Sequence, residues 1–303
     1  MPHRRATPRP PRAPVDAARP RGYSLLAPHP TANAPTEAIV LVIAERINAT
    51  RTRIARALDR RDAGLIAREA RAQAEAGADF IDVNAASDPK SELKNLAWAI
   101  GVVQEHTDLP LCLDSASPAA LRRGLELVRS DAVMLNSVTA EQQKLDAVLP
   151  LAAESGALLV ALTMDEGGVP KTAEQRVDIA GRLIEACESA GVPRERLYVD
   201  PCVQPVSTDI GQGPEVIAAV RRITDEFEGV HTTCGLSNVS FGLPRRGLLN
   251  RTFLVCLIAA GLDAAICDPT APGLMDAVRA AEALVGRDEY CMDYIRAMRA
   301  SAT

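Results

Sequence analysis

The sequence is poor in aromatic side chains and has no strong excess of charge. Phe, Trp and Tyr make up only 3% of its 303 residues, although apolar residues make up 47%. A core must therefore consist mostly of Ala, Val, Leu and Ile, a composition that suits parallel strands packed against helices. The net charge of -5 is mild and argues against a nucleic-acid-binding protein that relies on a basic surface.

Cysteine pairs and long apolar runs are also missing. The seven cysteines contain no CxxC pair, so they predict reduced thiols in a cytoplasmic protein, not a disulfide framework or a zinc cage. No apolar run approaches the roughly 20 residues that a membrane-spanning helix needs, so no membrane contact is expected. The four histidines do not cluster, and we expect no metal site.

Residues 1–36 differ in composition from the rest of the chain. They are dense in Pro and Arg and contain a single acidic residue, Asp16. This stretch cannot bury enough apolar surface to fold alone, and it lacks the continuous apolar segment of a secretory signal. The sequence predicts a disordered tail over 1–36, with an overcalled start codon or a transit peptide as alternatives, and one folded domain over 37–303.

Strand-like and helix-like segments alternate from residue 38 onward. Eight short apolar segments are each followed by a longer segment whose apolar residues have helical spacing. This alternation implies parallel pairing, because each return to the sheet needs a crossover, and eight units predict an α/β fold of the closed (β/α)8 barrel type. An open doubly wound sheet is the alternative, but no GxGxxG follows the first strand. The expected strands are 38–45, 79–84, 109–115, 131–137, 157–164, 196–201, 229–238 and 263–269, and the expected helices are 62–77, 91–106, 117–130, 139–156, 172–191, 213–227, 248–261, 273–286 and 289–300.

Polar residues recur where these strands are expected to end. A barrel of this type places its active site at the carboxyl ends of its strands. One Asp or Asn after a strand is commonly a turn or capping residue, but turns and caps do not explain a recurrence at the same end of almost every strand. The residues at these ends are Glu45, Asn48, Asp82, Asn84, Asp114, Asn136, Thr163, Met164, Asp200, Ser237, Asn238 and Asp268.

The residue types at these strand ends restrict the reactions and ligands expected at the site. They include no Lys, which argues against a Schiff-base aldolase. His106 and His231 fall near a helix end and a strand start, away from the expected site. Carboxylates accept hydrogen bonds, and amides both donate and accept them, so the set suits a flat, nitrogen-rich heterocycle with an amidine-like edge. A neutral amide can also follow a ring nitrogen through a change of protonation.

Seven short motifs give the chain a family resemblance from about residue 39 onward. In their observed order, they resemble those of the pterin-binding methyltransferases, which have a dihydropteroate synthase-like barrel. The resemblance is to methyltetrahydrofolate:corrinoid/iron–sulfur protein methyltransferase and to the folate-side methyltransferases of demethylating systems. The motifs are ERIN (45–48), CLDS (112–115), MLNS (134–137), LTMDEGGVPK (162–171), YVDP (198–201), GLSNVSFG (235–242) and LLNRTFL (248–254).

This resemblance implies a reaction and a set of site residues. It implies a methyltransferase that moves a methyl group between N5 of tetrahydrofolate and the cobalt of a corrinoid (cobalamin) carried by a separate protein, and it implies a homodimer. Asn238 is the implied catalytic residue, supporting the changing protonation of N5. The implied pterin- and folate-binding residues are Asp114, Asn136, Asp200, Ser237, Asn238 and Arg246, and the expected supporting residues are Glu45, Asn48, Asp82, Asn84 and Asp268.

Two other interpretations stay open. Dihydropteroate synthase uses the same barrel and pterin pocket, but ERINATRTR stands where its NxTxDSF loop would lie, and its catalytic Lys loop is not recognisable. A non-enzymatic corrinoid-binding or assembly protein on the same scaffold is opposed by the absence of a DxHxxG signature. SNVSF also resembles the folate module of cobalamin-dependent methionine synthase, but the chain is too short for that enzyme's other modules.

Overall fold

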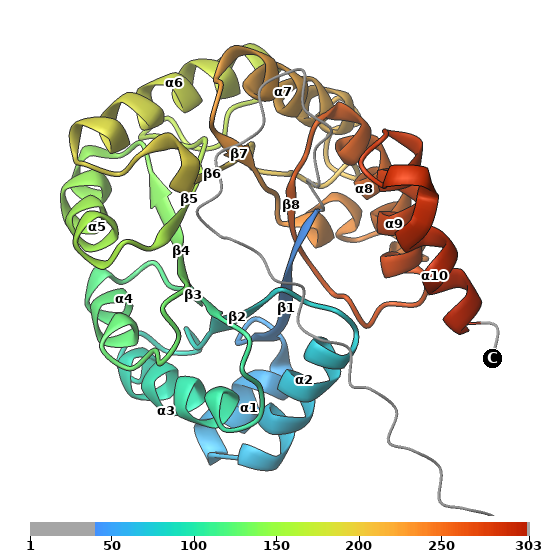
Figure 1. The fold of residues 1–303 in the computed structure, drawn as a ribbon. Coiled ribbons are helices and arrows are strands. Elements are labelled where there is room, and N and C mark those ends of the chain that lie inside the picture. Colours follow the sequence, from blue (N-terminus) through green and yellow to red (C-terminus); the bar gives the residue numbers. More distant parts are fainter. Residues whose placement is uncertain (1–39, 302–303) are drawn as a thin grey trace, which may run out of the picture.

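Eight parallel strands form a barrel inside a ring of helices in the computed structural model, which describes residues 40–301 (Figure 1). Hydrogen-bonded neighbours follow the order β7-β6-β5-β4-β3-β2-β1-β8. The ends of this series meet where Gly235 bridges Ile266, whose N–H donates to the Cys234 carbonyl at 2.9 Å. The predicted (β/α)8 barrel is confirmed. The strands are β1 (Leu41–Asn48), β2 (Phe80–Asn84), β3 (Leu111–Asp114), β4 (Val133–Thr139), β5 (Leu158–Leu162), β6 (Leu197–Asp200), β7 (His231–Thr232) and β8 (Ala264–Cys267).

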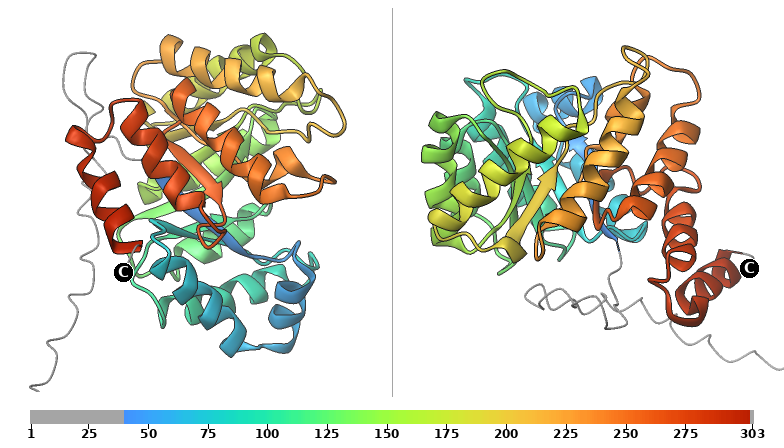
Figure 2. Two further views of the ribbon diagram at one scale, coloured as in Figure 1. Left: turned by 90° about the vertical axis from the view of Figure 1, so that its right-hand side faces the viewer. Right: turned by 90° about the horizontal axis from the view of Figure 1, so that it is seen from above.

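The helices begin where the sequence supplies caps. Ser117 accepts the N–H of Ala120 with Pro118 at the first position, and Thr172 forms a capping box with Gln175. The last helix lies outside the ring of the others (Figure 2). The helices are α1 (Thr52–Arg60), α2 (Ala63–Glu75), α3 (Glu92–Gln104), α4 (Pro118–Leu125), α5 (Gln142–Ser155), α6 (Ala173–Ser189), α7 (Gln212–Glu226), α8 (Arg246–Ala260), α9 (Leu274–Leu284) and α10 (Met292–Ser301), with short 3-10 helices η1 (Arg194–Arg196), η2 (Leu236–Ser240) and η3 (Glu289–Cys291).

A missed helix and several shifted element boundaries distinguish the structure from what the sequence predicted. Helix α1 was not predicted; its apolar residues are few, and Ile54 and Leu58 are the large ones that it buries. Strand β1 continues past Glu45 to Asn48, with a register shift between Ala44 and Ile47. The seventh strand was expected to run to residue 238, which is wrong: β7 ends at Thr232, and the chain turns into η2. The tail expected over 1–36 lies outside the described residues.

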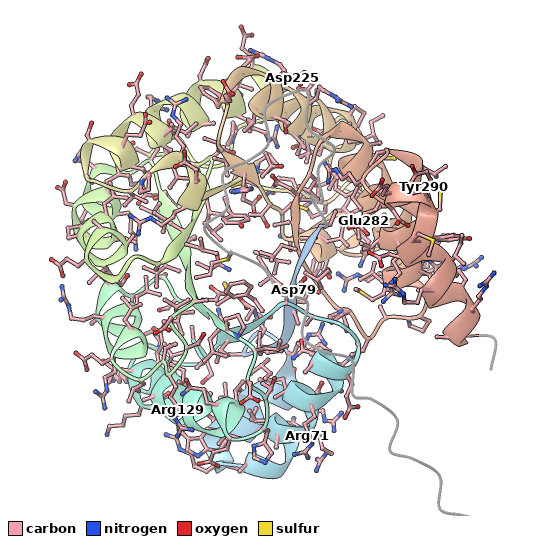
Figure 3. The ribbon with its side chains drawn as sticks, in the orientation of Figure 1. Arg71, Asp79, Arg129, Asp225, Glu282 and Tyr290 are labelled. Carbon is pink, nitrogen blue, oxygen red and sulfur yellow. The ribbon has the colours of Figure 1, made fainter. Side chains whose placement is uncertain are left out.

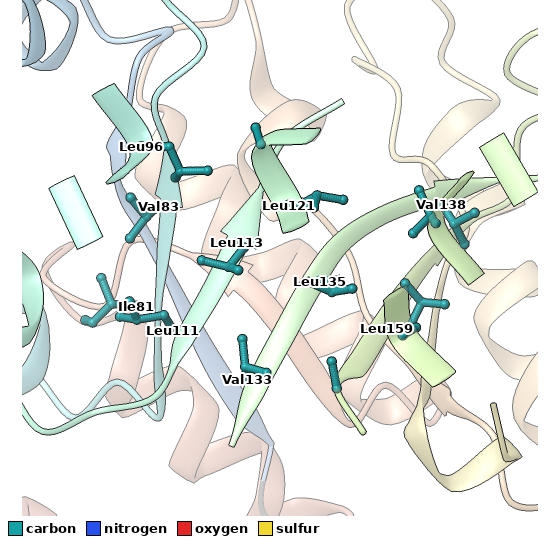
Figure 4. Packing of buried hydrophobic residues seen from close by; sticks show 14 of the residues in the cluster. Ile81, Val83, Leu96, Leu111, Leu113, Leu121, Val133, Leu135, Val138 and Leu159 are labelled. Carbon is teal, nitrogen blue, oxygen red and sulfur yellow. The ribbon is translucent and has the colours of Figure 1, made fainter. Parts of the chain in front are cut away.

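The core has an inner and an outer part. Inward side chains of the strands fill the barrel axis with apolar residues such as Ile43, Phe80, Met134 and Val160. Two larger clusters lie between the strands and the surrounding helices. Figure 4 shows part of the outer layer, where strand residues such as Leu113 pack beside helix residues. Burial on both sides explains why the strand bodies are continuously apolar.

Most labelled charged side chains in Figure 3 lie on the outer ring, but two lie beside the start of β1. The N–H of Val42 donates to Asp79 Oδ2 at 2.8 Å, and the N–H of Val40 donates to Glu282 Oε1 at 2.6 Å. These bonds fix the entry of the chain into the barrel. Over residues 40–301, no helix combines the length and the apolar character needed to cross a membrane.

Two helical glycines allow a matched test of the packing between helix and barrel. A Cβ at Gly124 in α4 would lie 2.7 Å from Leu113 Cδ1, whereas a Cβ at Gly101 in α3 would meet no heavy atom within 4 Å. We expect Gly124→Ala to lower the free energy of unfolding by about 1–3 kcal/mol through overpacking. Gly101→Ala should raise it by up to about 1 kcal/mol, because Ala favours helix. Urea unfolding of both variants measures this, and equal effects would contradict the packing described.

Candidate functional site

Alternate side chains of β2 and β3 point into the barrel. At the carboxyl ends of these strands the inward side chains are polar. Cys112 belongs to the inner core and Leu113 to the outer one, so the next residue, Asp114, faces inward. The same alternation turns Asp82 and Asn84 of β2 inward. These residues are at the carboxyl ends of their strands, where the apolar filling of the barrel gives way to polar groups.

Two carboxylate–amide pairs connect three neighbouring strands. Asn84 Nδ2 of β2 donates to Asp114 Oδ2 of β3 at 3.0 Å, and Asn136 Nδ2 of β4 donates to Asp82 Oδ1 of β2 at 3.3 Å. The amide nitrogen of Asn136 is thus held by a buried carboxylate. Within residues 40–301, no donor occupies Asn136 Oδ1, so that oxygen stays available as an acceptor.

The opposite side of the mouth is built from β1, β6 and the segment after β7. Ser237 Oγ donates to Glu45 Oε1, which ties η2 to β1. Asp200 at the end of β6 accepts the N–H of Cys202 at 2.7 Å and the N–H of Gly235 at 3.2 Å. Both oxygens of this buried carboxylate are therefore held by backbone donors, and each keeps a lone pair for a ligand.

These groups line one mouth of the barrel from both sides, and we call them the polar arc. Asp114 and Glu45 both lie near enough to Asp82 to raise its pKa, so the two sides of the mouth are electrostatically connected. The arc thus brings most of the sequence-predicted site residues to one face of the barrel. Its members are Glu45, Asp82, Asn84, Asp114, Asn136, Asp200 and Ser237.

Asn238 lies in η2 beside this arc, not at a strand end as expected. Its side chain is exposed, and none of the described residues forms a hydrogen bond with its amide. Its backbone N–H donates to the Gly235 carbonyl at 3.3 Å, and a Cβ at Gly235 would come within 3.3 Å of Asn238 Nδ2. The glycine therefore gives the amide room, and the amide is open to a ligand.

Arg246 holds the same segment from the start of α8. Its Nη2 donates to the Ser237 carbonyl at 2.6 Å and its Nε to Ser240 Oγ at 3.0 Å. Its guanidinium carbon lies 6.0 Å from the centre of the Phe241 ring. Arg246 therefore braces η2 and remains exposed at the rim.

Asn48 is bonded within its own turn, and Asp268 lies beside the polar arc, where its charge raises the pKa of Glu45. Asn48 Oδ1 accepts the N–H and the hydroxyl of Thr50, at 2.9 and 2.7 Å, and so stabilises a local turn. Asp268 pairs with Arg46 at 3.0 Å, and Arg51 lies 3.8 Å from both Asp268 and Glu45. These two arginines were missed at the sequence level, although Arg46 lies within the ERIN motif.

Burial dominates the electrostatics of the arc. It raises the pKa of Asp114 to about 6, opposed by the hydrogen bond from Asn84, and raises the pKa of Asp200 to about 6, opposed by two backbone donors. Burial also raises the pKa of Glu45, and it raises the pKa of Asp82 well above its usual range, with the charge of Asp114 adding to the effect. The mouth therefore holds carboxyls that titrate near neutral pH.

The histidines lie away from this arc. His106 Nδ1 contacts the Val102 carbonyl at 2.8 Å, and His231 pairs with Asp263 and stacks on Tyr198 at the opposite end of the barrel. In the described part of the chain, no group of three His, Cys, Asp or Glu side chains is arranged to hold a metal ion.

Comparison with known proteins links this geometry to a family. The family described as "Pterin binding enzyme" matches residues 44–268. The methylcorrinoid:tetrahydrofolate methyltransferase of Eubacterium limosum is 36% identical over 262 residues, which are 86% of this chain and 96% of that protein. The methionine synthase of Mycobacterium tuberculosis is 35% identical over 246 residues, which are 76% of this chain but only 20% of that protein.

Solved structures agree on the fold. Dihydropteroate synthase from Xanthomonas albilineans, in complex with 7,8-dihydropteroate, has a TM-score of 0.60 at 23% identity and covers 82% of this chain and 94% of its own. A Yersinia pestis dihydropteroate synthase has a TM-score of 0.61 at 17% identity, with 82% and 95% covered. At this identity the likeness shows the barrel alone. Together with the family match over most of the barrel, it means that this chain belongs to the pterin-binding enzymes.

Proposed function

We propose that this protein is a methyltransferase that moves a methyl group between N5 of tetrahydrofolate and the cobalt of a corrinoid carried by a separate protein. The observation that carries the proposal is the polar arc with the Asn238 amide beside it, an amide that no residue within 40–301 bonds. The 36% identity to a methylcorrinoid:tetrahydrofolate methyltransferase over 86% of the chain supports the same reaction.

The donors and acceptors of the arc fit a pterin ring. The amino and amide edge of a pterin presents N–H donors next to a carbonyl acceptor. Asp114 and Asp200 offer carboxylate oxygens, and Asn136 offers an oxygen whose orientation Asp82 fixes through the amide nitrogen. We propose that these three residues bind the pterin ring. Asn84 and Asp82 position Asp114 and Asn136 through hydrogen bonds.

The exposed amide suits the chemistry at N5. When the methyl group leaves, N5 keeps the electron pair of the broken bond, and a neutral N5 would depart as an anion. A proton that N5 takes from water removes that cost, while the cobalt of the partner's corrinoid would take up the methyl group; in the reverse direction the methyl group returns to N5 and the proton to water. Asn238 can donate to N5 before the methyl group leaves and accept from N5–H afterwards, because an amide has both functions.

Two finer expectations accompany this proposal. The methyltransferases that the chain resembles are homodimers, and we propose the same assembly here. A cytoplasmic location remains a prediction from composition; all seven cysteines lie in the described part of the chain and are free.

Asn238→Ala tests the assigned catalytic role. We expect kcat for methyl transfer to fall by about two orders of magnitude, as for loss of proton-transfer support, while tetrahydrofolate affinity changes by less than about threefold. Turnover is followed by corrinoid absorbance, and affinity by calorimetry. Asp225→Ala, an exposed site on the outer ring (Figure 3), is the surface control. An affinity loss as large as the rate loss would contradict the role.

The raised carboxyl pKa values predict how folate binding depends on pH. Asp114 and Asp200 have pKa values of about 6, so both are ionised above that pH and accept pterin N–H groups. Tetrahydrofolate affinity should therefore be nearly constant above pH 7 and fall as pH drops through 6, by up to about tenfold per pH unit for each carboxyl that must lose its proton. Calorimetric titration between pH 5 and 8 measures this.

Asparagine variants identify the titrating groups. Asp114→Asn and Asp200→Asn should each bind more weakly at pH 7.5 and lose part of the acidic fall in affinity. The stability of the ligand-free protein should change with pH in the opposite direction to the affinity. Its carboxyls bind protons more readily in the folded state than in the unfolded state. Stability should rise from pH 7 to 5, less so in each variant. An affinity that is flat from pH 5 to 8 in the unsubstituted protein would rule out this assignment.

A further inference from the structure

One fully buried cation lies behind the polar arc and was not recognised in the sequence. Arg176 of α6 has a relative exposure of 0%, the largest side chain so completely buried among the described residues. Its Nε donates to the Pro201 carbonyl at 2.6 Å, and its Nη2 donates to Gln212 Oε1 at 2.8 Å. Its Nη1 is buried without a hydrogen-bond partner in the part of the chain that the structure describes.

Stability does not explain this arrangement well. A buried charge without a partner ion costs several kcal/mol, and well-packed apolar residues commonly replace buried ions without loss. Arg176 pairs with no carboxylate in residues 40–301, and burial lowers the pKa of its guanidinium. A long apolar side chain would fill the same space between α6 and β6 at less cost. The charge is therefore expected to serve something near it.

Asp200 of the polar arc lies directly before the segment that Arg176 holds. Arg176 holds the carbonyl of Pro201, the residue directly after Asp200, and the side chain of Gln212, the first residue of α7. These two bonds fix both ends of the loop between β6 and α7. The same loop supplies the Cys202 N–H that binds Asp200 Oδ1 at 2.7 Å. Arg176 thus controls the position of the backbone that orients this carboxylate.

The charges around Asp200 come from several elements. Arg176 from α6 lowers the pKa of Asp200, against the larger raising effect of burial. The thiols of Cys202 after β6 and Cys234 after β7 face the same carboxylate, and burial raises the pKa of both, to about 12 for Cys202. Glu215 of α7 lies near Arg176 and accepts the N–H of Ala173. Arg176 is the one cation in this described set.

We propose that Arg176 is a positioning residue for the site: by holding the Pro201 carbonyl and the Gln212 side chain, it fixes the loop that orients Asp200 toward the ligand. Its positive charge also favours the ionised form of that carboxylate. This inference rests on the proposed function, in which Asp200 binds the pterin ring. Arg176 would thus act on the site from α6, one of the outer helices, whereas the ligand-binding residues lie at the strand ends.

Arg176→Met separates this role from a purely structural one. Loss of the charge should move the pH at which tetrahydrofolate affinity falls upward by up to about 1 unit, because the positive charge of Arg176 favours the ionised form of Asp200. A structural defect would weaken binding equally at every pH. Arg182→Met, an exposed arginine on the same helix, is the matched control and should leave the fall in place.

The test is completed by repeating Arg176→Met in an Asp200→Asn background. In that background, Arg176→Met should not change the pH at which tetrahydrofolate affinity falls. The carboxylate on which the Arg176 charge acts has already been replaced. Arg176→Lys provides a second variant in case the Met variant does not fold. It keeps a charge but cannot span Pro201 and Gln212 together, so affinity at pH 8 should fall several-fold.

The outcomes are distinguishable. If Asp200→Asn leaves tetrahydrofolate binding unchanged at every pH, the proposed pterin site and this inference are both overturned. If Asp200→Asn weakens binding but Arg176→Met leaves the acidic fall where it is in the unsubstituted protein, the pterin site stands and the role of Arg176 is wrong. Unchanged affinity at pH 8 in Arg176→Lys would also overturn it.

Discussion

The need to satisfy buried carboxylates at the mouth of an otherwise apolar barrel governs this structure. A carboxylate removed from water is costly unless hydrogen bonds replace its hydration. Here the replacements are amides on neighbouring strands and backbone N–H groups after β6 and β7. The Asn84–Asp114, Asn136–Asp82 and Gly235–Asp200 bonds each link two elements, so satisfying the charge also sets the relative positions of the strand ends. The polar arc is a structural and a chemical unit at once.

The same contacts decide what the arc can present to a ligand. Asp82 and Asn84 use their hydrogen-bonding capacity on Asn136 and Asp114, and those two residues keep acceptors that no described residue occupies. Binding residues held by a second row lose little freedom when a ligand arrives. This division of labour explains why two inward positions of β2 are both polar: each serves a different neighbour.

The fold could be predicted from the sequence because each of its strand signals is local. Apolar runs, capping residues such as Ser117 and Thr172, and the repeated alternation specify eight units, which a closed barrel satisfies. The polar arc was also predictable as a set, since parallel strands bring their carboxyl ends to one face. Its pairings were not, because which amide meets which carboxylate depends on register and shear across the barrel.

Three residues show what could not be predicted from the sequence. Ser237 and Asn238 were expected to end a strand, yet the closure between β7 and β8 needs a single bridge at Gly235, and the chain then turns into η2. Arg176 carries no local signal at all: in AEQRVD it reads as a solvent-facing helix residue. Its burial follows only from how α6 packs over the end of β6, a contact between segments about 25 residues apart.

The placement of Asn238 follows from this geometry. On a strand, its amide would be fixed by inward neighbours, as the amides of Asn84 and Asn136 are. In η2 it stays exposed, while Ser237 beside it is anchored to Glu45 and to Arg246. The backbone of Asn238 is fixed through its anchored neighbours, and its amide has no hydrogen-bond partner among the described residues. Such an amide can act as donor or as acceptor toward a ring nitrogen. In the proposed reaction, the residues of the polar arc would hold the pterin rigidly, and Asn238, whose amide no described residue bonds, would meet the atom whose protonation changes.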